Sequence, residues 1–365
     1  MVRGTLNRKA HIMETKKRLE YIDVIRGITI TLVVLQHVVS ICYTPKELSP
    51  AYMSLQQVRM PLFFLISGFL FFKIGRDWNS REFIGFIKKK IPVQILSPAI
   101  FMFIYGLFIG IGFKEGIMNK SKYGYWFTFT LFQFFIFFIT TQKVLGLLKI
   151  KGIYCSIALL LTGWLVCVIS LDSIEANSLW NKKLADLLGT DKWHYYIFFV
   201  SGTIIKDYFT YFEQLIKKNI TLILCFTLVV AINIKKVYLL QFFDYQLLQF
   251  VCGITSITFV FALFRKLENV LSKKRIAGKI LQLVGSRTLD IYLLHFFFVY
   301  STLGRSILSP EFDSNLFQIL YIIFITAAIV ATTLAISWVI RLNPTLGHFL
   351  FGSKKAPETE KIAKA

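Results

Sequence analysis

Long apolar runs alternate with short polar and basic segments along almost the whole chain. Each run has about 15 to 25 residues, close to the length that an α-helix needs to cross the hydrocarbon core of a bilayer. Ten such runs can be counted: residues 21–43, 58–74, 91–113, 123–141, 150–171, 193–210, 219–234, 245–264, 282–303 and 316–341. The pattern therefore predicts an all-α integral membrane protein, a bundle of about ten transmembrane helices.

The polar stretches at the two ends suggest the domain boundaries. We expect a basic N-terminal tail at residues 1–20, a ten-helix membrane domain at 21–341 and a C-terminal tail at 342–365. No apolar segment of the signal-peptide type precedes residue 21, so we expect the N-terminal tail to stay in the mature protein. No repeat with a period of about 20 to 50 residues is visible, which argues against a solenoid and against an inverted-repeat transporter.

Composition and charge support the membrane class and suggest an orientation. The 365 residues are 55% hydrophobic and 16% aromatic, and the net charge is +22. Lys and Arg lie in short runs between apolar segments rather than interleaved with aromatic residues on one face, so we expect no nucleic-acid partner. If the N-terminus is inside, the cytoplasmic segments hold 28 Lys and Arg and the outer loops hold 10. This bias predicts that both termini are cytoplasmic and that the basic loops contact membrane lipids.

The first apolar run contains three polar residues, Asp23, Arg26 and His37. Arg26 and His37 are about three helical turns apart, so their side chains emerge on nearly the same face, ~16 Å apart along the axis. A charge at such a depth costs about 2.5 kcal/mol or more, and such residues usually face a cavity, a partner or a substrate path. The alternative is structural: Asp23 neutralises Arg26, and His37 forms a hydrogen bond with a neighbouring helix.

The second run begins near Arg59 and Pro61. Because proline suits the first turn of a helix, we expect the helix to begin near Pro61, with Arg59 just outside it on the outer side. There Arg59 either meets a polar acceptor or extends towards lipid headgroups. Ser67 and Gly68 further along are small residues, which typically allow helices to pack closely.

The ninth run and the segment before the third run carry further charges. Arg287 and Asp290 are spaced to pair on one helix. His295 lies about 140° around the helix from Asp290, so one helix does not make them a catalytic set, and such a histidine more often satisfies a backbone or hydroxyl partner. The basic run 88–90 can bind phosphate or simply attract anionic lipid.

In their order along the chain, these motifs resemble those of acyltransferase family 3, a family of integral-membrane O-acyltransferases. The motifs are Arg26 and His37 in an Arg-x10-His pattern, Met60-Pro61-Leu62-Phe63-Phe64-Leu65-Ile66-Ser67-Gly68, Tyr125-Trp126-Phe127, Phe198-Phe199-Val200-Ser201-Gly202, and Gly285-Ser286-Arg287-Thr288-Leu289-Asp290-Ile291-Tyr292-Leu293-Leu294-His295. The resemblance runs from about residue 18 to residue 345.

The resemblance implies a reaction and its participants. Acetyl-CoA, or another short acyl-CoA, would bind from the cytoplasm, and the acyl group would pass to a hydroxyl of a cell-surface or lipid-linked carbohydrate without a metal. His37 matches the catalytic histidine of the family and Arg26 its partner arginine. An imidazole can act as a general base or as a transient acyl carrier, and the sequence leaves both open.

The remaining site assignments follow from the same resemblance. The candidate substrate-binding residues are Arg59, Ser67, Trp126, Asp290 and His295. The candidate residues for binding the acyl-CoA donor are Arg26, Lys88, Lys89 and Lys90. Proteins of this family often show paired arginines before the third span, where this chain has lysines and Gln94 instead, so its contacts with CoA are expected to differ.

A second interpretation comes from a different functional class. A polytopic glycan exporter or proton-coupled transporter could use Arg26, His37 and Asp290 as a translocation path. The sequence shows no inverted repeat and contains the motif of residues 60–68, and both observations favour an acyltransferase over a transporter. Walker A, GxGxxG, HExxH and nucleophile-elbow motifs are absent, so nucleotide-driven pumps, dinucleotide enzymes and metalloproteases are not expected. We expect a multi-pass protein of the cell membrane, a bacterial inner or plasma membrane, and the sequence gives no indication of the oligomeric state.

Overall fold

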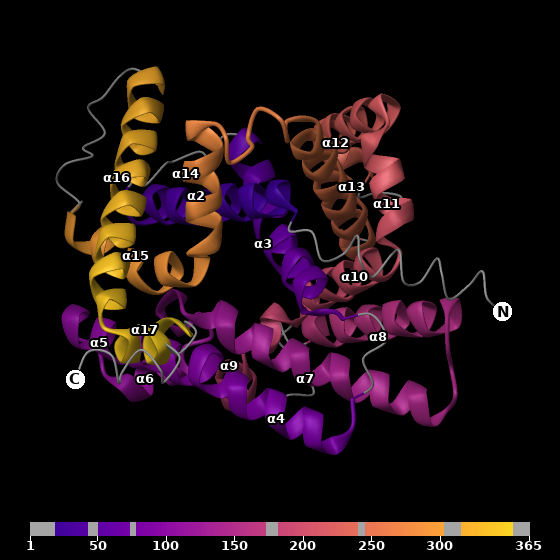
Figure 1. Ribbon diagram of the computed structural model, residues 1–365, viewed down its shortest axis with the longest axis horizontal. Helices are drawn as coiled ribbons and strands as arrows, with labels where there is room; N and C mark the ends of the chain where they lie inside the picture. Colours follow the sequence, from indigo (N-terminus) through magenta and orange to yellow (C-terminus); the bar gives the residue numbers. More distant parts are fainter. Residues whose placement is uncertain are drawn as a thin grey trace, which may run out of the picture.

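The computed structural model describes residues 19–42, 50–73, 78–172, 182–239, 245–302 and 315–352. Over this part of the chain the protein is helical and contains no strand (Figure 1). The elements are α2 (Glu20–Cys42), α3 (Pro50–Phe71), α4 (Ser80–Ile91), the π-helical turn η1 (Pro92–Leu96), α5 (Ser97–Ile109), α6 (Phe113–Met118), the 3₁₀ turn η2 (Lys122–Gly124), α7 (Trp126–Leu147), α8 (Ile153–Asp172), α9 (Lys182–Leu188), the 3₁₀ turn η3 (Thr190–Tyr195), α10 (Tyr196–Asp207), α11 (Phe209–Lys217), α12 (Asn219–Leu239), α13 (Tyr245–Lys266), α14 (Ile276–Ser286), α15 (Thr288–Thr302), α16 (Asn315–Leu342) and α17 (Pro344–Phe351).

Six helical segments among the described residues are long and apolar enough to cross a membrane. They are Glu20–Ser40, Ser80–Ile109, Trp126–Leu147, Ile153–Ser170, Leu247–Lys266 and Ile319–Leu342. A seventh results if α11 and the first part of α12, which meet at an angle of 83°, form one bent span. The all-helical architecture that the sequence predicts is therefore confirmed for the described residues, but the count of ten spans is not.

Two of the other apolar runs form shorter helices because local breaks interrupt them. The run 193–210 gives only the 12 residues of α10, and the run 282–303 is divided at Arg287 between α14 and α15. Hydropathy averaged along a sequence detects apolar content but not such breaks. Most of the predicted tails, 1–20 and 342–365, lies outside the described residues, and their cytoplasmic location stays a prediction.

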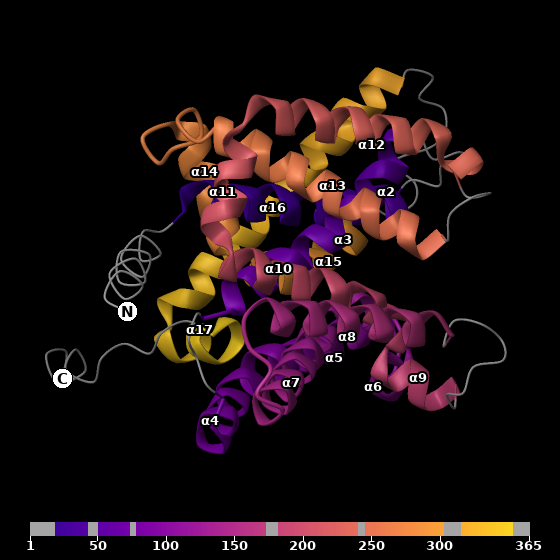
Figure 2. The same cartoon turned by 90° about the vertical axis from the view of Figure 1, so that its right-hand side faces the viewer.

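Helix α2 runs behind α14 in the upper half of Figure 1, and α3, α14, α15 and α16 pack against it. Helices α11, α12 and α13 form one side, while α4, α7 and α8 lie along the opposite side (Figure 2). Of the 18-residue apolar stretch in each helix, 61% of the residues are buried in α2 but only 22% in α16. The polar residues of α2 are therefore placed to meet other helices rather than lipid.

Pairs of glycines allow the two closest helix crossings. A Cβ atom added at Gly285 of α14 would lie 1.8 Å from the carbonyl oxygen of Asp23 in α2. A Cβ atom at Gly68 of α3 would lie 2.0 Å from the carbonyl oxygen of Phe199 in α10, and one at Gly202 would lie 2.0 Å from that of Leu65. Gly68 thus has the packing role that its small size suggests.

One detail of α3 differs from the expectation. The helix begins at Pro50, so Pro61 lies inside it and Arg59 is a helical residue rather than a residue just outside the first turn. A proline inside a helix removes one backbone hydrogen bond but does not prevent helix on both sides of it when the segment is packed. Sequence reasoning assigned the proline its commonest position, and the residues before it extend the helix instead.

Candidate active site

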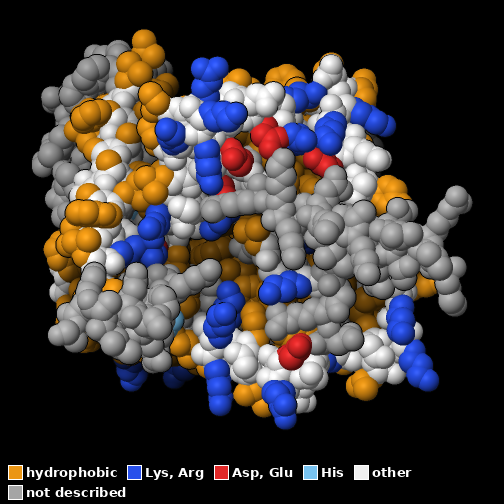
Figure 3. All heavy atoms as spheres, viewed as in Figure 1, with side chains coloured by type: hydrophobic (Ala, Val, Ile, Leu, Met, Phe, Trp, Pro, Cys, Tyr) orange, Lys and Arg blue, Asp and Glu red, His pale blue; other side chains and the backbone are white. Residues whose placement is uncertain are grey.

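A cavity of about 240 Å³ is lined by residues of α2, α3, η1, η2, α7 and α15. Five residues that the sequence predicts for the site line this cavity: Arg26, His37, Arg59, Ser67 and Trp126. The wall between them is largely apolar, with side chains such as Val33, Phe63 and Leu131. In Figure 3 the visible face is hollowed near its centre, with hydrophobic side chains inside the hollow and Lys and Arg side chains around it.

Arg26 lines the cavity near the N-terminal end of α2. Its Nη1 lies 3.3 Å from Oδ1 of Asp23, one turn earlier. Its Nη2 donates a hydrogen bond to the hydroxyl oxygen of Thr288 at 3.1 Å, and Thr288 also lines the cavity. The structural interpretation of Asp23 as the counter-charge of Arg26 is confirmed, and the same contacts hold the guanidinium at the cavity wall.

His37 lies about three turns further along α2, on the same side of the helix. Its ring centroid is 4.7 Å from that of Phe296 and 5.3 Å from that of His295, both on α15. Arg59 of α3 lies close enough to interact electrostatically with both imidazoles. The cavity is therefore lined by the His37 imidazole and by two guanidinium groups, that of Arg59 on α3 and that of Arg26 on α2.

The turn before Trp126 has an unusual backbone that fixes the start of α7. Lys122, Tyr123 and Gly124 have φ angles of 49°, 51° and 94°. The Lys122 ammonium group is buried and donates hydrogen bonds to the carbonyl oxygens of Ile117, Asn119 and Asp186. Burial lowers the pKa of Lys122 to about 8. This lysine joins the turn to α6 and α9, which offsets the cost of its left-handed backbone.

Gly124 and Tyr292 connect this turn to α15. The Tyr292 hydroxyl donates to the carbonyl oxygen of Gly124 at 3.1 Å and accepts a hydrogen bond from the backbone N–H of Phe127 at 3.2 Å. A Cβ atom at Gly124 would lie 1.9 Å from the ring of Phe296, so only glycine fits there. Trp126, held between these contacts, lines the cavity and stacks on Tyr195 with ring centroids 6.0 Å apart.

The π-helical turn η1 brings a buried amide to the cavity. Gln94 lies between Pro92 and Pro98, and its side chain is only 8% exposed. No hydrogen-bond partner of its Oε1 occurs among the described residues. Single π-helical turns are frequent at functional sites, where they re-aim side chains. A buried acceptor of this kind is available to a ligand that brings a donor.

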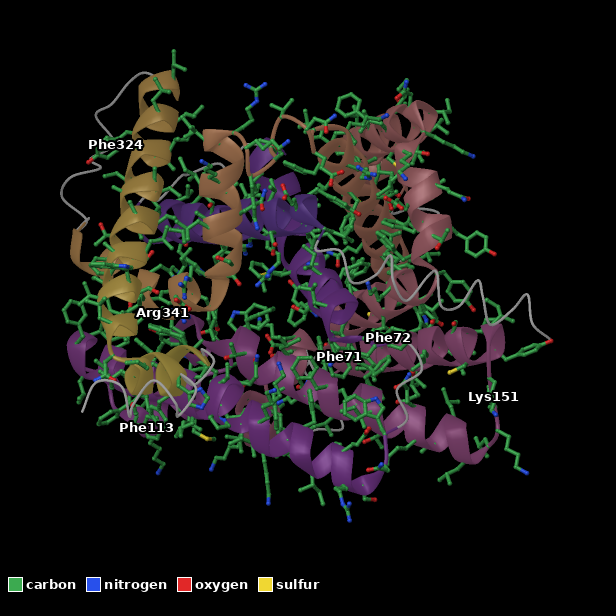
Figure 4. The ribbon with its side chains drawn as sticks, in the orientation of Figure 1. Phe71, Phe72, Phe113, Lys151, Phe324 and Arg341 are labelled. Carbon is green, nitrogen blue, oxygen red and sulfur yellow. The ribbon has the colours of Figure 1, made fainter. Side chains whose placement is uncertain are left out.

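Asp290 lies away from the cavity lining. Its carboxylate accepts hydrogen bonds from Arg341 of α16, from Nε at 2.8 Å and from Nη2 at 2.9 Å, and another from the Ser337 hydroxyl. The Nη1 atom of Arg287, the partner expected from spacing, lies 3.8 Å from Oδ2 of Asp290. Figure 4 shows Arg341 on α16 beside α15. The structure gives Asp290 a role in joining α15 to α16, and contact with a substrate stays a prediction.

The three lysines expected to hold the donor do not line the cavity. Lys88 and Lys89 are exposed on α4. The Lys90 ammonium lies 5.2 Å from the ring centroid of Phe135 and 5.8 Å from that of Phe86, a cation–π arrangement. Their predicted role in phosphate binding therefore depends on the part of a donor that extends beyond the cavity.

Comparison with known protein families identifies the chain. A family model described as an acyltransferase domain matches residues 19–341, nearly the whole chain. The chain belongs to acyltransferase family 3. No curated protein and no solved structure matches it. This member of acyltransferase family 3 is therefore a multi-pass membrane acyltransferase, and the cavity is its candidate active site.

Sequence reasoning about this acyltransferase missed three polar residues of the cavity, Thr128, Thr288 and Tyr292. Thr288 and Tyr292 are one helical turn apart, so their spacing within an apolar run was a signal that they share a face. Thr128 carried no comparable signal, because its position follows from the turn that begins α7. The roles of Arg59, Ser67 and Trp126 in substrate binding stay predictions.

Proposed function

We propose that the protein is a membrane O-acyltransferase that moves an acetyl or other short acyl group from cytoplasmic acyl-CoA to a hydroxyl of a cell-surface or lipid-linked carbohydrate, in a bacterial inner or plasma membrane. The observation that carries this proposal is the cavity of an acyltransferase family member lined by both Arg26 and His37. The transport alternative has no support in the family match.

The chemistry assigns a role to each of these side chains. The His37 imidazole takes the proton of the acceptor hydroxyl while the hydroxyl oxygen forms a bond to the acyl carbon. The C–S bond then breaks, and the departing CoA sulfur receives that proton from His37. Arg26, about three helical turns from His37, carries a permanent positive charge and N–H donors, which suit the phosphates of CoA.

The shape and polarity of the cavity support a short acyl group. Its volume of about 240 Å³ is small, and its wall is mostly apolar. Apolar side chains exclude water, which would otherwise hydrolyse the thioester and weaken every electrostatic contact in the site. Arg59 and Trp126 line the same cavity, and we assign them to the carbohydrate acceptor because guanidinium and indole groups both contact sugars readily.

Transfer from labelled acetyl-CoA to a carbohydrate acceptor in detergent or nanodiscs tests this proposal. His37→Ala should abolish transfer while the variant still purifies as a folded protein. His348→Ala on α17 is a control, since His348 does not line the cavity. Undiminished transfer by His37→Ala would refute the role of His37. A labelled acyl group found covalently bound to His37 would show that His37 is an acyl carrier rather than a general base.

A further inference from the structure

His295 is a buried histidine with one unsatisfied nitrogen. The residue is 0% exposed, and its Nδ1 lies 2.9 Å from the carbonyl oxygen of Ile291 one turn earlier. A carbonyl oxygen only accepts hydrogen bonds, so Nδ1 carries the hydrogen and Nε2 of the neutral ring is an acceptor. No partner of Nε2 occurs among the described residues. A buried acceptor without a partner is unfavourable and requires an explanation.

The groups that face His295 come from three helices. His37 of α2 has its ring centroid 5.3 Å away, and Phe296 and Tyr292 of α15 are at 4.1 Å and 6.3 Å. Arg59 of α3 interacts with it electrostatically. The Tyr292 hydroxyl already bonds to the backbone of Gly124 and Phe127, so it is not the missing donor.

The distance to His37 fits a hydrogen bond between two imidazoles. In an N–H···N bond the nitrogen atoms are about 3 Å apart, and roughly 1 Å separates each nitrogen from its ring centroid, so the centroids lie roughly 5 Å apart. The observed 5.3 Å, with an angle of 36° between the ring planes, therefore allows this bond when a nitrogen of His37 is turned towards His295 Nε2. The exposed side of His37 meanwhile faces the cavity.

We propose that His295 is a positioning residue for His37. Its Nε2 accepts a hydrogen bond from one imidazole N–H of His37, which fixes the His37 tautomer and turns the lone pair of the other nitrogen towards the acceptor hydroxyl. The inference rests on the proposed function. His295 stays neutral throughout: the hydroxyl proton passes to His37 and then to the departing sulfur, and the bond to His295 strengthens while His37 is an imidazolium.

Three substitutions of His295 distinguish the role of its hydrogen-bond acceptor, Nε2, from the role of the rest of the side chain. His295→Gln places an amide oxygen close to the position of Nε2, and so retains an acceptor for His37. His295→Asn retains a donor for the Ile291 carbonyl but lacks that acceptor, and His295→Leu lacks both. We expect kcat to fall on the order of 100-fold or more in the Asn and Leu variants, with KM for acetyl-CoA within about twofold of wild type. His295→Gln should recover at least about tenfold of the loss in kcat.

A matched control is available in the 3₁₀ turn η3. His194 also has its Nδ1 within hydrogen-bonding distance of a backbone carbonyl, that of Asp191 at 2.8 Å, but does not line the cavity. His194→Asn should leave kcat within about twofold of wild type. Any one of three results would overturn the proposal. The first is an equal kcat in His295→Gln and His295→Asn, the second is a change in KM without a change in kcat in the Asn and Leu variants, and the third is a wild-type kcat in His295→Leu.

A spectroscopic measurement reports the tautomer of His37 directly and does not depend on enzymatic activity. In protein labelled with ¹⁵N-histidine, the His37 signals of the wild type should show a single neutral tautomer, and His295→Asn should show a mixture. Unchanged His37 signals would mean that His295 does not contact His37, whatever the activity. If His37→Ala abolishes transfer while His295→Asn is fully active, only this inference fails. If His37→Ala is fully active, the proposed function fails as well.

Discussion

At the scale of single residues, Asp290 and Arg26 show how charges are accommodated inside an apolar bundle. Asp290 is 1% exposed and is held by Arg341, which comes from another helix 51 residues later. Arg26 bonds to Asp23 nearby and to Thr288, 262 residues away. Spacing along one helix predicted the local partner in each case, Arg287 and Asp23. It could not predict the distant partners, because they depend on which helices become neighbours.

We expect Asp290→Asn to lower the free energy of unfolding by about 3 to 5 kcal/mol, because it removes one partner of a buried, bidentate ion pair and leaves the Arg341 guanidinium uncompensated. Thermal unfolding of the purified protein measures the loss. Lys217→Ala is the control, since Lys217 is 52% exposed in its pair with Glu213, and less than about 1 kcal/mol is expected there. Unchanged stability with reduced transfer would instead place Asp290 on the substrate.

At the scale of elements, two close helix crossings and one irregular helix arrange the site. The crossing of α3 with α10 at Gly68 and Gly202 fixes the helix that carries Arg59 and Ser67. The segment from α4 through η1 to α5 is continuous, and its π-helical turn directs Gln94 to the cavity. The apolar runs predicted most of these helices. The break at Arg287 and the π-helical turn at Pro92–Leu96 were not predictable, since they depend on packing as well as on local preference.

Gly68→Ala should strongly destabilise the protein. The new Cβ atom would lie 2.0 Å from the Phe199 carbonyl oxygen, so α3 and α10 would have to separate. We expect a loss of about 1 to 3 kcal/mol in the free energy of unfolding, and lower transfer activity because Ser67 would shift with the helix.

Gly85→Ala in α4 is the matched control, because a Cβ atom at Gly85 would meet nothing within 4 Å. Replacing a glycine in an open helix interior should stabilise by about 0.5 to 1 kcal/mol. Thermal unfolding in the same detergent compares the two variants. Similar effects of both substitutions would contradict the close crossing at Gly68.

At the scale of the whole molecule, the candidate active site is assembled from six elements, α2, α3, η1, η2, α7 and α15, most of which are far apart in sequence. Residues from Arg26 in α2 to Tyr292 in α15 line one cavity. Helix α2 packs against α3, α14, α15 and α16, and 61% of the residues in its apolar stretch are buried, so its polar face is enclosed by protein. Gln94, which sequence reasoning noted only as a departure from the family pattern, becomes a cavity residue with a buried acceptor.

Gln94→Leu should raise KM for acetyl-CoA while the ligand-free protein keeps its stability or gains about 1 kcal/mol. In the ligand-free protein the Oε1 acceptor is buried without a partner among the described residues, so leucine removes an unfavourable group. The pantetheine arm of CoA contains amide N–H groups that would bond to this oxygen. Steady-state kinetics and thermal unfolding measure the two effects.

Gln133→Leu is the contrasting control for that experiment. Gln133 bonds to the Leu188 carbonyl and to the Trp193 indole, so leucine at this position should cost about 1 to 3 kcal/mol of stability and leave KM unchanged. A destabilised Gln94→Leu variant with normal KM would show that Gln94 is structural.

The sequence by itself determined the helical class, the family and the shared face of Arg26 and His37, because apolar length, helical period and motif order are properties of neighbouring residues. The tertiary structure decided what these residues meet. It placed Thr288 at Arg26, His295 at His37 and Arg341 at Asp290. Among the described residues it shows six, or up to seven, helical segments long and apolar enough to cross a membrane, so the ten predicted spans are not confirmed. The three pairings join helices that are remote in sequence, and no local pattern specifies them.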